Sequence, residues 1–188
     1  MRGVLIWLLL MTIPAGLVWA DSFIQKDFNQ LVAEAEQIFV GPVTAAQSRK
    51  LPTGVIVTDV TFSKPRVLKG SEIFGDLVLL VLGGSLESET LKLSGFPDFL
   101  LGGTYLVFSR GNGTEIFPVV GGTQGLFQVK RDPVTGEDLV FDAYGMPITS
   151  PTVANAISTS ASSPGPLQPS QAVTLDAFIR AIKNRLSP

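Results

Sequence analysis

The chain has 188 residues, of which 14 are Lys or Arg and 16 are Asp or Glu, and it contains no histidine and no cysteine. These absences exclude Ser-His-Asp and Cys-His catalysis, zinc sites built from nitrogen and sulfur ligands, and disulfides. The slightly acidic balance argues against a nucleic-acid partner, because nucleic acids bind clustered basic side chains. No motif in the chain indicates a metal or a cofactor.

The first twenty residues have the pattern of an export signal. Arg2 precedes the apolar run Val4–Ile13, and small residues lead up to a cleavage point after Ala20. The run is short for a membrane-spanning helix. We therefore expect a periplasmic or extracellular protein with no stable membrane span after cleavage. The alternative is an uncleaved N-terminal anchor.

A helix and then a series of strands are predicted from residue 22 onward. The stretch 22–37 predicts a short amphipathic helix. Its apolar face would consist of Phe28, Leu31, Val32 and Ala35. The stretch 53–70 predicts a long strand that bends near Pro65. Some seven or eight short strands, separated by turn signals, predict an all-β barrel or sandwich.

The glycine-rich stretch VVGGTQGLFQV, residues 119–129, suggests either a phosphate-binding loop or a bend between strands. A phosphate loop follows a strand and opens a helix, since the helix N-terminus supplies the N–H donors. After Gly125 the apolar side chains alternate with a period of two. A strand is therefore expected there, and the glycines are expected to turn or bulge the chain.

The C-terminal part changes in character. Residues 146–172 are rich in Ser, Thr, Ala and Pro and predict a flexible linker. Residues 173–188 predict an amphipathic helix with Thr174 as its N-cap. Its apolar face comprises Leu175, Phe178, Ile179, Ile182 and Leu186. The helix either docks on its own barrel or offers the first four of these side chains to a partner's groove.

Two groups of residues are candidates for binding. Lys64, Arg66 and Lys69 form a small basic cluster, which would grip an anionic ligand or simply charge the end of a strand. Phe96, Phe99 and Tyr105 would line a ligand pocket or plug the end of a barrel.

Several segments together resemble a known architecture. The turn VLKG at residues 67–70 and the strand GGTYLVF at residues 102–108 look like parts of the netrin-type modules of tissue inhibitors of metalloproteinases. The chain also resembles a group of uncharacterised bacterial exported proteins. The resemblance implies an OB-like, partly closed barrel and, by analogy of fold, a binding role. The inhibitors' N-terminal cysteine has no counterpart here, so their inhibitory chemistry does not carry over.

These expectations combine into one hypothesis. The protein would comprise a signal peptide at 1–20, an OB-like β-barrel domain at 21–145, the linker at 146–172 and the helix at 173–188. It would be an exported, non-catalytic binding module for a protein or a cell-envelope component. One alternative is a carboxylate-based hydrolase of the glycosidase kind. Another is a carrier that holds a small ligand inside the barrel.

Overall fold

The structure is a computed structural model that describes residues 24–86, 89–92, 99–115, 117–150 and 171–187. Strands dominate it, so the expected all-β class is confirmed. The helices in these ranges are α1 (Phe28–Glu34), the 3₁₀ helix η1 (Gly122–Gly125) and α2 (Leu175–Leu186). The strands are β1 (Gln37–Lys50), β2 (Ile56–Phe62), β3 (Arg66–Lys69), β4 (Leu77–Leu82), β5 (Gly84–Leu86), β6 (Glu89–Leu91), β7 (Thr104–Ser109), β8 (Leu126–Arg131) and β9 (Asp138–Asp142).

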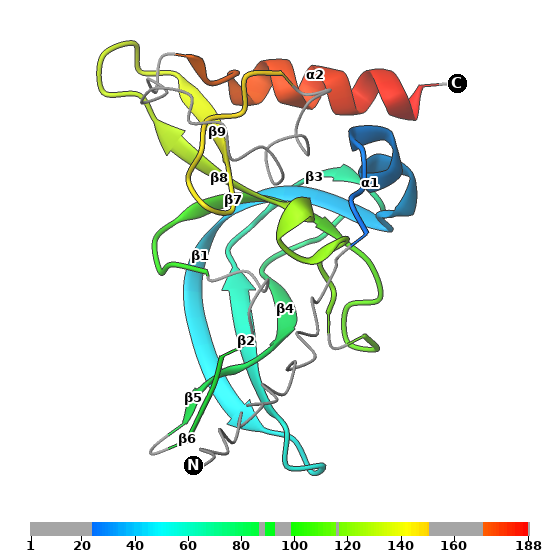
Figure 1. The fold of residues 1–188 in the computed structure, drawn as a ribbon, viewed down its shortest axis with the longest axis vertical. Coiled ribbons are helices and arrows are strands. Elements are labelled where there is room, and N and C mark those ends of the chain that lie inside the picture. Colours follow the sequence, from blue (N-terminus) through cyan, green and yellow to red (C-terminus); the bar gives the residue numbers. More distant parts are fainter. Residues whose placement is uncertain (1–23, 87–88, 93–98, 116, 151–170, 188) are drawn as a thin grey trace, which may run out of the picture.

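Seven of these strands form one antiparallel sheet that does not close into a barrel. Its order is β4-β2-β1-β7-β8-β9, and β3 pairs with β1 beside this path. A separate hairpin, β5–β6, lies near the far end of the β1–β2 hairpin (Figure 1). The sheet therefore ends at two strands, β4 and β9, where a closed barrel would have no end strand.

The long strand β1 organises the sheet and arches across the molecule (Figure 1). Its first half pairs with β7 on one side and β3 on the other, and its second half pairs with β2. Between β2 and β3 the chain turns at Lys64, which has a φ of 40°, and at Pro65. The predicted bend near Pro65 is confirmed, but the single long strand predicted over 53–70 is two strands, β2 and β3, which pair with different parts of β1.

Alternating side chains of β1 and β7 serve two separate cores, as the period of two in a strand requires. The first core lies in the concave part of the sheet and contains Phe39, Val43, Val60, Phe62, Leu79, Tyr105, Val107, Val119 and Leu126. The second lies under the two α-helices and contains Phe28, Leu31, Val32, Ala35, Ile38, Val40, Leu106, Phe108, Val120, Phe127, Val140, Ile148, Phe178 and Ile182. Strand β7 is thus buried on both faces.

Helix α1 is shorter than the predicted stretch 22–37, whereas α2 begins after Thr174 as predicted. Asp27 caps α1 by accepting a hydrogen bond from the Gln30 amide, and the Gln30 side chain accepts one from the Asp27 amide. Thr174 caps α2 by accepting from the Ala177 amide. The predicted apolar face of α1 is fully buried.

Helix α2 docks on its own chain, next to β9 and α1 (Figure 1). Phe178, Ile179 and Ile182 are buried, and the Phe178 ring meets the Phe28 and Phe127 rings at centroid distances of 5.5 and 5.1 Å. Leu175 packs at the edge of the same core. The core covers Phe178, Ile179 and Ile182 and partly covers Leu175, so these four side chains do not form an open face for a partner.

Chain segments on both sides of residues 151–170 cover the β9 edge. The Val140 amide donates to the Val173 carbonyl at 3.0 Å, and the Ile148 amide donates to the Val140 carbonyl at 3.1 Å. The Val173 amide donates to the Ile148 carbonyl at 2.7 Å. Residues 146–148, assigned to a linker from composition, therefore belong to the folded body, and residues 151–170 lie outside the described ranges.

The glycine-rich stretch turns the chain, as expected. Gly121 and Gly122 have φ values of 65° and 64° and lead into η1, after which β8 begins at Leu126. Gly125 has an ordinary φ but no room for a side chain, because the backbone oxygens of Val120 and Phe108 press against it. A phosphate loop needs an α-helix after the glycines, because the N–H groups at the helix N-terminus bind the phosphate. Strand β8 follows Gly125 instead, so this stretch does not fit such a loop.

Asp142 at the end of β9 gives a pH-dependent prediction. Its Oδ1 accepts hydrogen bonds from the Tyr144 and Met146 amides. Burial raises the pKa of the carboxyl above its ordinary value, because it outweighs these hydrogen bonds and the nearby Lys130, which lower the pKa. Stability linked to this group is present below its unfolded pKa and is lost as the pH rises through the folded pKa.

We therefore expect Asp142→Asn to keep both hydrogen bonds and to be equally stable or slightly more stable than wild type at pH 7, by less than about 1 kcal/mol. Urea unfolding between pH 3 and 7 should show a flatter pH dependence for this variant. Asp142→Ala, which loses both bonds, should cost about 1–3 kcal/mol. Equal pH profiles for wild type and Asp142→Asn would contradict the assignment.

The expected export signal, residues 1–20, lies outside the described residues. Within the described part, no helix combines the length and apolarity that crossing a membrane requires. Cleavage after Ala20 and an exported location stay predictions.

Candidate functional site

The structure divides the predicted basic cluster. Lys64 and Arg66 are exposed. Lys69 instead turns to the C-terminal end of α1, where its Nζ donates to the carbonyls of Val32 at 2.7 Å and Ala33 at 3.2 Å. A cation there satisfies carbonyls that the short helix leaves unpaired and complements its dipole. The three residues therefore do not form one anion-binding group, and Lys69 has a structural role.

This role gives a stability prediction. Lys69→Met keeps most of the side chain's length but removes the cation, so we expect it to lower the free energy of unfolding by about 1–2 kcal/mol. Arg66→Met on the same strand is the matched control, and its effect should stay within about 0.5 kcal/mol. Urea unfolding measures both. Equal effects of the two substitutions would show that Lys69 does not cap α1.

The aromatic candidates lie in the core of the concave sheet. The Phe99 ring contacts the rings of Phe62 and Tyr105 at centroid distances of 5.6 and 5.2 Å. Tyr105 is buried, and its hydroxyl accepts a hydrogen bond from the Leu100 amide at 2.7 Å. Tyr105 therefore belongs to this core and Phe99 packs against it. The two residues do not line a ligand pocket, contrary to the expectation. Phe96 lies outside the described residues.

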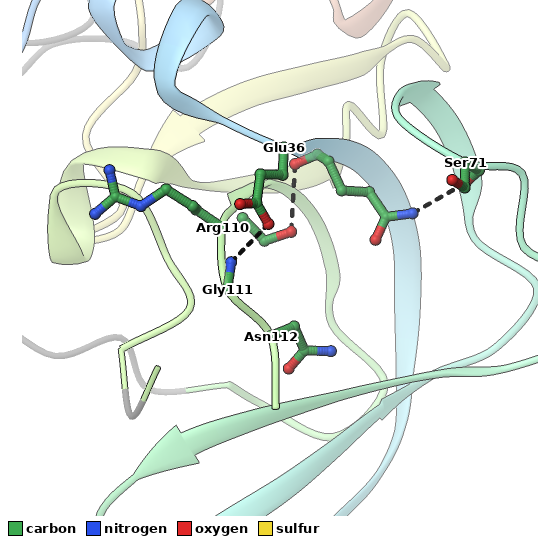
Figure 2. A pocket seen from close by; sticks show the side chains of 7 residues that line it. Glu36, Ser71, Arg110, Gly111 and Asn112 are labelled. Atoms are coloured by element: carbon green, nitrogen blue, oxygen red, sulfur yellow. Dashed lines mark hydrogen bonds between the residues drawn. The ribbon is translucent and has the colours of Figure 1, made fainter. Parts of the chain in front are cut away.

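A polar pocket lies where α1, β1, β7 and the β3–β4 loop meet (Figure 2). It has a volume of about 320 Å³. We call it the Glu36 pocket, and its lining residues are Glu36, Gln37, Ser71, Ser109, Arg110, Gly111 and Asn112. Such a volume falls in the lower part of the range for small-ligand or side-chain binding.

Hydrogen bonds fix the walls of the Glu36 pocket (Figure 2). The Gly111 amide donates to Glu36 Oε2 at 2.9 Å. Gln37 Nε2 donates to the Ser71 carbonyl at 3.1 Å, and Ser109 Oγ donates to the Gln37 carbonyl at 3.3 Å. These bonds hold the walls of the pocket in place.

The two charged side chains of the pocket, Arg110 and Glu36, differ in whether an opposite charge lies beside them. Arg110 lies 3.5 Å from a Glu34 oxygen and 3.4 Å from a Glu115 oxygen, so its charge is already shared. Glu36 is exposed and has no cationic partner among the described residues. The pocket thus presents one carboxylate that is open to a cationic group.

Asn112 joins the pocket to the edge of the sheet. Its Nδ2 donates to the Val78 carbonyl at 2.7 Å, and its Oδ1 accepts from the Leu80 amide at 3.1 Å. Both groups belong to β4, the end strand of the sheet. One carboxamide side chain therefore occupies part of an otherwise open strand edge.

A second pocket, of about 360 Å³, lies between the β8–β9 turn and the start of α2. Its charged lining residues are Arg131, Glu137, Asp138, Asp176 and Arg180. Arg131 and Asp138 pair with each other at 3.3 Å. Because both signs of charge line this pocket, it favours no single kind of ligand.

The Glu36 pocket was not anticipated from the sequence, since its walls come from segments that are far apart in the chain. Asn112 did carry a local signal, an Asn-Gly turn, but that signal does not reveal what its side chain contacts. The chain matches no protein-family model, no curated protein and no solved structure.

Proposed function

We propose that the protein is an exported, non-catalytic binding module that recognises another protein or a cell-envelope component. We further propose that its open, curled sheet is a variant of the OB-like, netrin-type barrel. The observation that carries the binding role is the Glu36 pocket, a polar hollow with hydrogen-bonded walls and one carboxylate that has no cationic partner among the described residues. Hollows of this kind orient a ligand through a few placed polar groups.

The carrier alternative receives less support from the packing. A carrier would hold its ligand in the concave part of the sheet, but nine buried side chains occupy that position. Four aromatic rings, those of Phe39, Phe62, Phe99 and Tyr105, contact one another there edge to face. A ligand would have to displace them.

A pull-down with a matched pair of variants tests the proposal. The mature protein, residues 21–188, is immobilised and exposed to the envelope and culture extract of the producing organism. Glu36→Arg reverses the charge in the pocket, and Glu72→Arg reverses an exposed charge nearby that does not line the pocket. Wild type and Glu72→Arg should retain one protein or glycan in near-stoichiometric amount, and Glu36→Arg should retain about tenfold less.

Two results would contradict this function. Retention of nothing from either extract would remove the binding role. Hydrolytic activity of the mature protein would favour the carboxylate enzyme instead, provided that Asp138→Asn or Asp176→Asn in the second pocket abolished it. Equal retention by Glu36→Arg and wild type would leave the binding role in place and move it away from the Glu36 pocket.

A further inference from the structure

The geometry points to the outer edge of β4 as the place where a partner protein adds an extended segment to the sheet, with a basic side chain of that segment reaching the Glu36 pocket. This inference rests on the proposed binding function and names the chemistry of the partner. It depends on three features: unpaired backbone groups, uncharged apolar side chains, and the position of Glu36.

The pairing of β4 with β2 identifies the groups that face outward. The two strands are antiparallel, with Leu79 opposite Val60 and Leu82 opposite Val57. Just past the strand, the Gly83 amide donates to the Ile56 carbonyl at 2.9 Å. In such a ladder, residues that bond to the neighbouring strand alternate with residues whose backbone groups point away from it. The residues that bond to β2 are therefore Leu77, Leu79 and Val81. The residues whose backbone groups point outward are Val78, Leu80 and Leu82.

Most of these outward groups have no hydrogen-bond partner in the part of the chain that the structure describes. Asn112 takes the Val78 carbonyl and the Leu80 amide. The Leu80 carbonyl and both backbone groups of Leu82 have no partner among the described residues. Three adjacent polar groups along an edge form a template for another strand, and extended peptides are commonly bound in this way.

Asn112 shows that the edge accepts a peptide-like group. A carboxamide carries the same N–H donor and C=O acceptor as a peptide bond, and it bonds to one carbonyl and one amide of β4. A partner strand would make the same kind of bonds farther along, at Leu80 and Leu82. Asn112 therefore marks one end of the open stretch.

The side chains of the edge strand are those of a contact surface. Leu77–Leu86 contains no charged residue and no proline, although edge strands that must stay unpaired usually carry one or the other. Val78 is 47% exposed, and Leu80 and Leu82 on the same face are partly exposed. A partner segment with apolar side chains at alternate positions would cover this face.

The Glu36 pocket specifies the charge of the partner. Asn112 bonds to the Val78 carbonyl of β4. It also lines the pocket (Figure 2). A segment that runs along Leu82 and Leu80 therefore arrives at the pocket once it has passed Asn112. The open carboxylate of Glu36 favours a Lys or Arg side chain at that point.

The experiment pans a phage-displayed library of random twelve-residue peptides against the immobilised mature protein. Enriched peptides should alternate apolar residues and carry Lys or Arg near one end. Their affinity is then compared for Leu82→Ala and Leu82→Pro. Both variants lose the leucine side chain, but only proline also removes the outward N–H donor and places its ring there. An edge strand tolerates proline at a position whose N–H points away from the sheet. We expect Leu82→Pro to bind at least about tenfold more weakly than Leu82→Ala.

Two further measurements accompany this comparison. Glu36→Gln keeps the acceptor for the Gly111 amide but removes the charge, so it should lose the preference for Lys and Arg. Hydrogen exchange in wild type should show the Leu82 amide slowed at least about tenfold by an enriched peptide, whereas the Val81 amide, already bonded to β2, should change little. This second readout holds even if Leu82→Pro does not fold.

Several results would overturn the inference. Enriched peptides that bind Leu82→Ala and Leu82→Pro equally, and leave the Leu82 amide unprotected, would place binding elsewhere. An absence of enriched peptides, while the envelope extract does yield a retained partner, would overturn strand addition but not the binding function. If neither the library nor the extract yields a binder, the proposed function fails together with this inference.

Discussion

Phe178→Ala is expected to lower the free energy of unfolding by about 3–5 kcal/mol, the usual cost of removing a fully buried aromatic side chain. Phe178 is completely buried and lies against the rings of Phe28 and Phe127, so the substitution would leave a cavity where α2, α1 and β8 meet. Small domains have a total stability of about 5–15 kcal/mol, so this one change would remove much of it. Urea denaturation followed by circular dichroism measures the effect.

Leu186→Ala is the matched control on the same helix. Leu186 is 37% exposed, and its substitution should cost less than about 1 kcal/mol. Truncation after Gln171, which removes α2 entirely, should destabilise the protein at least as much as Phe178→Ala. If the truncated protein kept the wild-type melting temperature, α2 would not be docked in solution, and its apolar face would again be open to a partner.

Gly125→Ala is expected to cost about 1–3 kcal/mol or more, the range for forcing an extra group into a packed interior. An added Cβ would lie too close to the Val120 carbonyl oxygen and 3.2 Å from that of Phe108. Those two residues are tied together, because the Val120 amide donates to the Phe108 carbonyl at 2.9 Å. The backbone would have to shift, and the buried strand β7 would shift with it.

Gly54→Ala is the comparison that distinguishes a steric cost from a cost of backbone conformation. Gly54 has a φ of 85° but nothing within 4 Å of an added Cβ, so its substitution should cost only about 1–2 kcal/mol through conformational strain. Gly125 has no such strain, and its whole cost is steric. Thermal unfolding of the two variants compares them. A neutral Gly125→Ala would mean that the turn before β8 is looser than its contacts indicate.

Features that depend on local periodicity could be predicted from the sequence. The faces of α1 and α2 follow from apolar side chains at helical spacing, since a helix must bury one stripe. The bend near Pro65 follows from the restricted backbone of proline. The strand after Gly125 follows from alternation. In each case a few neighbouring residues decide the outcome.

Features that depend on contacts between distant segments could not be predicted. The bond from Gly111 to Glu36 joins positions 75 residues apart, and the one from Asn112 to Val78 joins positions 34 apart. The role of Lys69 could not be seen either, because a cation near other cations in sequence suggests a cluster. Its actual partners are carbonyls of a helix that precedes it by more than thirty residues.

The closure of the chain across β9 determines where its length can change. A hydrogen bond of 2.7 Å joins Val173 to Ile148, so the described segments before and after residues 151–170 meet side by side at β9. The entropy of closing a loop depends only on the logarithm of its length, and doubling the length costs about 0.6 kcal/mol. Doubling the number of residues between Ser150 and Gln171 should therefore raise the entropic cost of this closure by only about 0.6 kcal/mol and leave the bond between Val173 and Ile148 in place.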